Sequence, residues 1–98
     1  RLNTGMDFEP EYITINNAGT KAYVTVQEAN AIGVLDLSTN SFEKVVGLGV
    51  KDFSLSGNQI DPLNNNNISF ISVNAKGLYM PDGIATYQFN GKDYLVMA

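Results

Sequence analysis

The chain has 98 residues, with 10 acidic and 6 basic side chains and neither Cys nor His. Without Cys or His there can be no disulfide, no zinc or haem centre and no nucleophile of the Ser-His-Asp or Cys-His type, so any metal would be a hard cation bound by oxygen atoms. The net charge of −4 argues against nucleic acid and anionic membrane as partners, and no apolar run is long enough to span a bilayer.

The first half of the chain reads as four short strands separated by turns. Each predicted strand is rich in β-branched or aromatic residues, and no ten-residue stretch has helical periodicity. Gly19 lies in the first turn, where a positive φ is available to it. The strands are predicted over residues 11–15, 21–26, 31–37 and 42–46, with a polar connection at 27–30 and a tight turn at 38–41. Their regular spacing predicts an antiparallel meander.

The segment 47–80 has the composition of a loop, with several glycines and four consecutive Asn residues at 64–67. A short strand is predicted inside it, over residues 68–73. Strand character then resumes over 83–89 and 92–98, on either side of Asn90-Gly91. Asn-Gly between two alternating runs is a strong signal for a β-hairpin.

An internal repeat relates the two ends of the chain. A shift of 71 residues places residues 10–26 on residues 81–97, and both copies read Pro-acid-x-Ile, a turn, and then Lys-x-Tyr-apolar-x-apolar. The matching pairs are Pro10/Pro81, Glu11/Asp82, Ile13/Ile84, Lys21/Lys92, Tyr23/Tyr94, Val24/Leu95 and Val26/Met97. Four-stranded units that repeat along a chain, each led by Pro, predict a β-propeller. We expect Tyr23 and Tyr94 to pack between blades.

We therefore expect an all-β partial propeller domain over 1–98. Residues 9–46 form one complete blade, 47–80 an inserted loop on one face, and 81–98 the first two strands of the next blade. Isolated hairpins are marginally stable and open sheets expose unpaired edges, so we expect the remaining blades to come from a longer chain.

Specific motifs carry a family resemblance. The segments 9–13, 19–26 and 30–37 resemble the YVTN-type propeller repeat. The whole chain is similar to the propeller domain of the choice-of-anchor I proteins, which are bacterial secreted or surface-attached proteins, on the motifs 10–13, 23–32, 49–54, 57–62, 79–85 and 94–98. The resemblance implies about one and a half blades of a seven-bladed ring of four-stranded antiparallel blades, and an extracellular or cell-surface location. Asn64–67 replaces an aspartate-rich loop of that family.

Five acidic residues are candidate calcium ligands, one at the start of the first predicted strand and the others in connections, because Ca²⁺ prefers six to eight oxygen atoms. They are Glu11, Glu28, Asp52, Asp61 and Asp82. The alternative is that they are solvated residues of a mildly acidic surface, and a catalytic carboxylate pair could be drawn from the same set. For Asp36 we expect a structural role, accepting hydrogen bonds from the Ser38-Thr39 turn.

The function favoured by the sequence is a non-enzymatic scaffold or binding module, stabilised by calcium, that recognises an extracellular ligand or a cell-surface polymer. Binding residues commonly lie on loops held by a rigid scaffold, and the long segment after the fourth strand is such a loop. Two alternatives remain: a metal-dependent hydrolase of the phosphoesterase type, and a structural subunit of a surface layer or filament.

Overall fold

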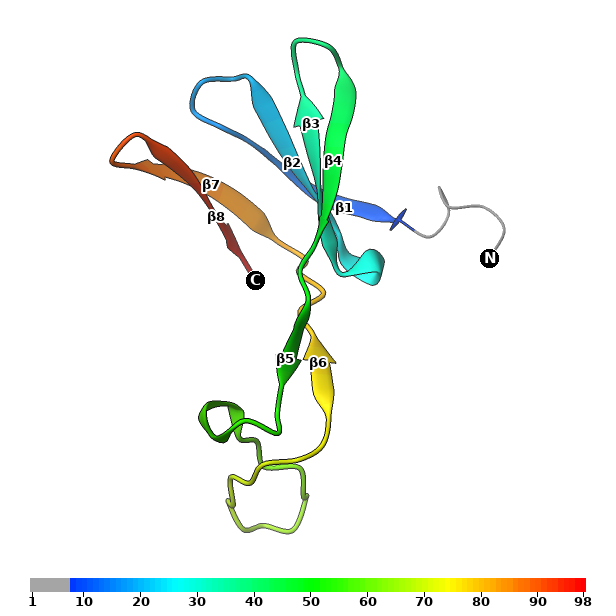
Figure 1. The fold of residues 1–98 in the computed structure, drawn as a ribbon, viewed down its shortest axis with the longest axis vertical. Coiled ribbons are helices and arrows are strands. Elements are labelled where there is room, and N and C mark those ends of the chain that lie inside the picture. The colour runs from blue at the N-terminus through cyan, green and yellow to red at the C-terminus, as the bar shows by residue number, and fades with distance from the viewer. Residues whose placement is uncertain (1–7) are drawn as a thin grey trace. The chain divides into compact units, whose positions relative to one another are not determined.

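The structure is a computed structural model that describes residues 8–98. It divides into two compact units. Among these residues, the first unit comprises those up to Leu48 together with Met80–Ala98, and the second is Gly49–Tyr79. Eight strands and two single-turn 3-10 helices are assigned within the described residues (Figure 1).

A four-stranded antiparallel meander dominates the first unit, and we call it the first sheet. Its strands lie in chain order. Gly19 has a φ of +68° in the first turn, as predicted, and Asn30 adopts the left-handed conformation that ends the 3-10 helix η1 (Gln27–Ala29). The strands are β1 (Pro10–Ile15), β2 (Lys21–Val26), β3 (Ala31–Asp36) and β4 (Ser41–Gly47). The predicted meander is therefore confirmed.

The core of the first unit lies on the two central strands of this sheet. Both faces of β2 and β3 are covered, since side chains that point to opposite faces are buried. The buried apolar residues are Ala22, Val24, Val26, Ala31, Ile32 and Val34, and Thr25 is the one fully buried larger side chain among the described residues. The edge strands β1 and β4 are largely exposed.

A β-hairpin, β7 (Ile84–Phe89) and β8 (Lys92–Met97), completes the first unit, and we call it the repeat hairpin. Its strands pair in continuous register from Ile84↔Met97 to Phe89↔Lys92. Asn90 and Gly91 both have positive φ, 49° and 71°, which is the turn that suits the twist of a two-residue hairpin. The Asn-Gly prediction is confirmed, and β7 contacts β1 of the first sheet.

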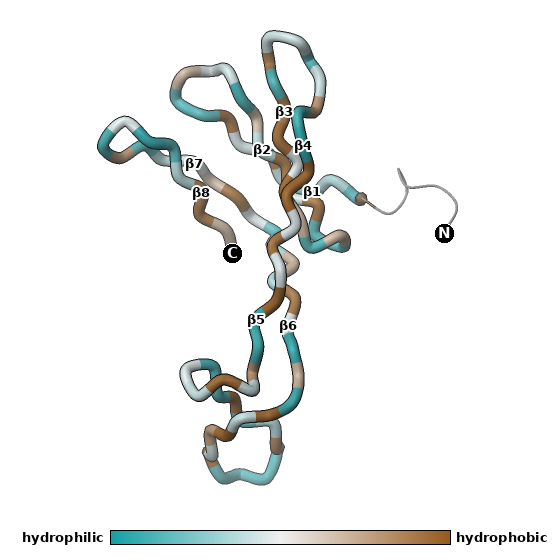
Figure 2. Tube along the Cα trace, in the orientation of Figure 1, coloured by the Kyte–Doolittle hydropathy of each residue, from teal (hydrophilic) through white to brown (hydrophobic). Residues whose placement is uncertain are grey.

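The second unit contains a short two-stranded sheet, β5 (Val50–Asp52) and β6 (Lys76–Leu78), and the 3-10 helix η2 (Ser56–Asn58). The run of four Asn residues forms a hydrophilic loop (Figure 2). These two short strands were not anticipated from the sequence, because three-residue strands have almost no periodicity to read.

The strand predicted over 68–73 is wrong. Within it only Ile71 pairs, exchanging both backbone hydrogen bonds with Ile60. The next such pair in an antiparallel ladder would need the backbone N–H of residue 62. Residue 62 is Pro, which has no N–H, so the ladder ends after one bridge.

The all-β prediction is confirmed over residues 8–98, which form antiparallel sheets of four, two and two strands. This arrangement is compatible with a fragment of a β-propeller. None of the helices in the described part of the chain has the length and apolar character needed to cross a membrane.

Candidate functional site

Three of the five predicted calcium ligands belong to the first unit. Glu11 is exposed on β1, Glu28 is exposed in the first turn of η1, and the Asp82 side chain is exposed just before β7. The backbone of Asp82 has a structural role, because its N–H donates to the carbonyl of Ala98 at 2.9 Å and its carbonyl accepts from Thr25 at 3.0 Å.

The other two predicted ligands belong to the second unit and stabilise loops. The Asp52 carboxylate accepts hydrogen bonds from the hydroxyl and the backbone N–H of Ser54. These bonds lower the pKa of Asp52. Asp61 accepts from the backbone N–H groups of Leu63 and Ser69, both at 3.3 Å. Within residues 8–98 no three acidic side chains are grouped so that they could hold a metal ion. The calcium site therefore stays a prediction.

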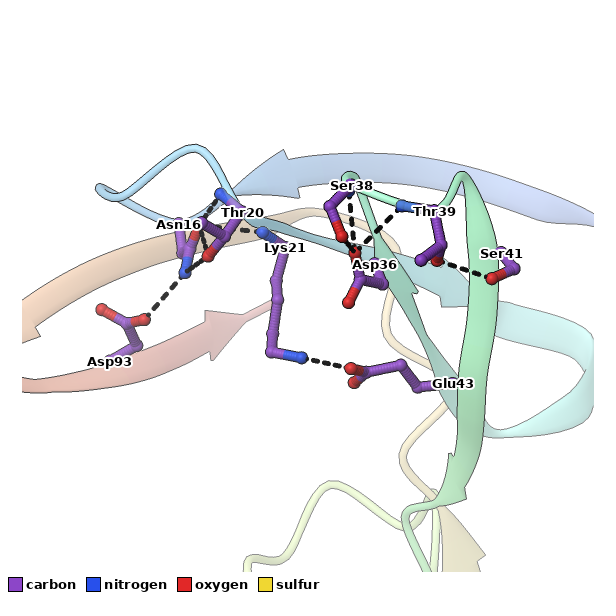
Figure 3. Close-up of polar contacts among 9 residues, drawn as sticks. All are labelled: Asn16, Thr20, Lys21, Asp36, Ser38, Thr39, Ser41, Glu43 and Asp93. Atoms are coloured by element: carbon purple, nitrogen blue, oxygen red, sulfur yellow. Dashed lines mark hydrogen bonds and ion pairs between the residues drawn. The ribbon is translucent and has the colours of Figure 1, made fainter.

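Asp36 has the structural role expected of it. Its Oδ1 accepts hydrogen bonds from the hydroxyl and the N–H of Ser38 and from the N–H of Thr39 (Figure 3). The Ser38 hydroxyl is the main cause of a lowered pKa at Asp36. Nearby, the ammonium of Lys21 donates to the Glu43 carboxylate, and this hydrogen bond raises the pKa of Lys21. The Asp36 hydrogen bonds and the Lys21–Glu43 ion pair both stabilise the end of the first sheet that is distant from η1.

A series of polar contacts joins the first sheet to the repeat hairpin, and we call it the seam. At its centre the hydroxyl oxygens of Thr14 and Thr86 lie 3.3 Å apart. The N–H of Thr86 donates to the Thr14 hydroxyl at 3.2 Å, and the Thr86 hydroxyl donates to the carbonyl of Ile15 at 2.9 Å. These bonds fix β7 beside β1 in one register.

Asn16 connects the seam to the β1–β2 turn. Its Oδ1 accepts from the backbone N–H of Thr20 at 2.9 Å and of Lys21 at 3.0 Å, as an Asn in a turn commonly does. Its Nδ2 donates to Asp93 on β8 at 3.2 Å (Figure 3). Asn16 is buried, so this side chain stabilises the turn and the hairpin contact together.

Thr25 lies at the other end of the seam. Its hydroxyl accepts from the N–H of Tyr12 at 3.0 Å and donates to the carbonyl of Asp82. Beyond Thr25, the segment that leads into β7 is held at Met80, whose backbone N–H and carbonyl are both hydrogen-bonded to side chains. The Asn30 side chain accepts from the Met80 N–H at 3.0 Å, and the Gln27 side chain donates to the Met80 carbonyl at 3.2 Å.

Apolar side chains accompany the seam. Leu95 of β8 lines a cavity of about 350 Å³ together with Tyr23, Ile32, Val34 and Val46 of the first sheet. Tyr23 thus faces the repeat hairpin. Its repeat counterpart Tyr94 stacks on Tyr87 at 5.2 Å between ring centroids, and both rings are exposed.

The opposite face of the first sheet carries an open apolar groove of about 340 Å³. Gly33 forms its floor, and the Phe42 ring lies over it so closely that a Cβ on residue 33 would be 2.9 Å from the ring. The groove is lined by Phe8, Pro10, Val24, Val26, Gly33, Phe42 and Val45, none of which is charged.

The seam is the most developed polar arrangement in the first unit, and the sequence did not single it out. Its residues are Thr and Asn side chains at ordinary strand and turn positions, and their partners are more than fifty residues away. The internal repeat aligns β7 with β1 and so indicates that the two strands are equivalent elements. An alignment does not show that the two strands are in contact.

No curated protein and no solved structure matches the chain significantly. The family model described as the choice-of-anchor I domain matches residues 2–98, nearly the whole chain. The chain is rich in strands and has the motifs of that family. It is therefore a bacterial surface-associated module, and it belongs to the choice-of-anchor I domain family.

Proposed function

We propose that the chain is part of a β-propeller scaffold on the bacterial cell surface, and that the scaffold binds a ligand rather than catalysing a reaction. In this proposal the first sheet is one blade and the repeat hairpin begins the next. Further blades from a longer polypeptide cover the open edge of β8 and the exposed apolar faces.

The observation that carries the proposal is the seam. Residues 10–26 and 81–97 are copies of one pattern, and the second copy packs on the first through Thr14–Thr86 and Asn16–Asp93. Sheets that repeat along a chain and pack face to face build rings whose blades have only short, protected edges.

The second unit supports the ligand-binding part of the proposal. It exposes several large apolar side chains within a polar segment, namely Leu55, Leu63, Ile68 and Phe70. Exposed apolar clusters rimmed by polar residues are common in interaction sites. We propose that this segment contributes to recognition of an extracellular ligand or a cell-surface polymer.

Surface exposure tests the scaffold directly. An epitope inserted in the Asn64–67 loop should be accessible to antibody on intact bacteria that express the full-length protein. Detection only after cell lysis would contradict a surface role. For ligand binding, the wild-type protein and a variant with residues 54–73 replaced by a Gly-Ser linker are mixed with purified cell-wall and capsular polymers. Binding that the replacement abolishes supports the second unit as the recognition element, and equal binding contradicts it.

Calcium stabilisation is proposed separately and has its own test. Thermal unfolding is followed with excess calcium and with a chelator, because an ion that binds only the folded state raises the unfolding temperature, and the rise grows with the logarithm of the free ion concentration above its Kd. A rise that Asp82→Asn removes and Asp93→Asn retains would support the predicted ligand. Identical curves with calcium and chelator would contradict calcium binding.

A further inference from the structure

One residue of the first unit binds the chain both where the second unit begins and where it ends. The chain leaves the first unit after Leu48 and returns to it at Met80. The backbone carbonyl of Asn30 accepts a hydrogen bond from the Leu48 N–H at 3.0 Å. The Asn30 Oδ1 accepts one from the Met80 N–H, also at 3.0 Å. The points of departure and return are therefore held on a single residue of the first unit.

Asn30 is itself fixed in place. It is buried, and it has the left-handed conformation, with φ and ψ both 49°. Its N–H donates to the Gln27 carbonyl at 2.8 Å, and the Gln27 side chain donates in turn to the Met80 carbonyl at 3.2 Å. We call Gln27, Asn30, Leu48 and Met80 the Asn30 anchor. All four residues belong to the first unit.

The backbone of Met80 indicates that the first unit sets the course of the returning chain. Met80 has a φ of +44°, which is uncommon for a residue other than Gly. Its counterpart under the 71-residue repeat is Glu9, which has a φ of +36°, and both residues directly precede a Pro. Because Glu9 is distant in sequence from the second unit, the left-handed residue before Pro belongs to the pattern of the repeat.

The second unit, taken by itself, also joins its two ends. Its strands β5 and β6 pair from Val50↔Leu78 to Asp52↔Lys76. The pairing continues at Phe53, whose N–H donates to the carbonyl of Ala75 at 3.0 Å. A segment whose ends lie close together is the kind that a folded domain accepts as an insertion.

We infer that the Asn30 anchor is the attachment point of an exchangeable recognition segment: it holds residues 48 and 80 whatever sequence lies between them. The inference rests on the recognition role proposed for the second unit, and it adds the anchoring residue and the separability of the segment from the scaffold. Its basis is that the hydrogen bonds of the anchor and those of the β5–β6 ladder each lie within one unit. A scaffold of this kind presents different recognition segments without a change in its blades.

Hydrogen exchange in the full-length protein tests the anchor at the Met80 amide. In one variant a short Gly-Ser linker replaces residues 50–78. In another, Asn30→Gly removes the side-chain acceptor and keeps a residue that tolerates a positive φ. Asn30→Asp retains an acceptor and is the conservative variant. Asn40→Gly is the matched control, because Asn40 also has a positive φ, 53°, but is exposed in the β3–β4 turn.

The Met80 amide is expected to stay protected in the linker variant, in Asn30→Asp and in the control. In Asn30→Gly it should exchange about tenfold faster, as the loss of one hydrogen bond implies. Fast exchange in the linker variant would mean that the second unit holds the returning chain, and it overturns the inference. Unchanged protection in Asn30→Gly overturns it as well.

Two further readouts keep the result unambiguous. If Asn30→Gly also speeds exchange throughout β2 and β3, Gln27→Ala takes its place, and an unchanged Met80 amide in that variant overturns the inference. The exchange measurement needs no ligand, so it is independent of polymer binding. A wild type that binds no cell-wall or capsular polymer, with a protected Met80 amide in the linker variant, would contradict the recognition role and leave the anchor standing.

Loss of polymer binding in the linker variant, with the Met80 amide still protected, is the result expected when both the recognition role and the anchor are correct.

Discussion

The two copies of the repeat, β1–β2 and β7–β8, have nearly the same pattern of residues and very different burial. Val26 is 6% exposed and its counterpart Met97 is 37% exposed. Thr25 is fully buried and its counterpart Val96 is 56% exposed. The first copy has β3 and the repeat hairpin as neighbours, whereas β8 is an open edge. The polar residue Thr25 is buried and the apolar residue Val96 is exposed. At this position the packing of neighbouring strands therefore determines burial more than the residue type does.

The copies also differ in register. Ile13 pairs with Val24, whereas its counterpart Ile84 pairs with Met97, so the two hairpins are offset by two residues. The first copy turns through residues 16–20, and the second through Asn90 and Gly91 alone. A two-residue offset keeps every side chain on its face, whereas an offset of one would reverse them all. Equivalent residues of the two copies therefore lie on equivalent faces although the turns differ.

The largest expected effect comes from exchanging the residues at one repeat position. Thr25→Val leaves the Tyr12 N–H and the Asp82 carbonyl without their partner, and we expect it to lower the free energy of unfolding by about 2–3 kcal/mol. The reverse change, Val96→Thr, lies on an exposed strand and should alter it by less than about 0.5 kcal/mol. Urea denaturation measures both. Equal effects would contradict the difference in burial between the copies.

Asn16 gives the next largest effect, because it serves the β1–β2 turn and the seam at once. Asn16→Ala is expected to cost about 1–2 kcal/mol in urea denaturation, since two backbone N–H groups lose their acceptor. Asn17→Ala is the matched control at the adjacent exposed position, and it should be near neutral. Hydrogen exchange should also speed up in β8 for Asn16→Ala. Unchanged protection of β8 would argue against the Asn16–Asp93 contact.

Gly33 tests the packing of the open groove. A Cβ at residue 33 meets the Phe42 ring at 2.9 Å, so Gly33→Ala must displace that ring, at a cost of about 1 kcal/mol. Gly47→Ala adds its Cβ to open space and is the control. The two variants are compared by chemical denaturation. A larger loss for Gly47→Ala would mean that Phe42 does not lie over Gly33.

The smallest effect is on the dependence of stability on pH. The pKa of Asp36 is lowered in the folded chain, so its contribution is present above the ordinary carboxyl pKa and is lost as pH falls through the lower folded value. Between about pH 5 and pH 2 the wild type should therefore lose stability more steeply than Asp36→Asn. Asp61→Asn serves as a control. Parallel curves for wild type and Asp36→Asn would contradict the Ser38 and Thr39 hydrogen bonds.

The strands of the first sheet could be predicted because KAYVTV and AIGVLD combine high β-propensity with clear turns on both sides. The Asn90-Gly91 turn was predictable for the same local reason. The strand predicted at 68–73 was wrong because its pairing partner, the segment around Ile60, contains Pro62, which has no backbone N–H to continue the ladder. The seam was missed because Thr14 and Thr86 are unremarkable until the fold places them together. The five acidic residues had the right chemistry for calcium, but sequence has no means of predicting distances between loops.

The central claim is that β7 packs on β1 through the seam, and an engineered disulfide across the seam tests this directly. The chain has no Cys, so a pair introduced as Thr14→Cys and Thr86→Cys would be the only thiols present. Their hydroxyl oxygens lie 3.3 Å apart in the wild type, and mild oxidation should close a disulfide within one chain. Non-reducing mass analysis of the monomer measures it. The account predicts efficient closure for this pair and little for Thr14→Cys with Tyr87→Cys, because residue 87 lies on the opposite face of the hairpin from residue 86. Equal closure of both pairs, or of neither, would contradict it.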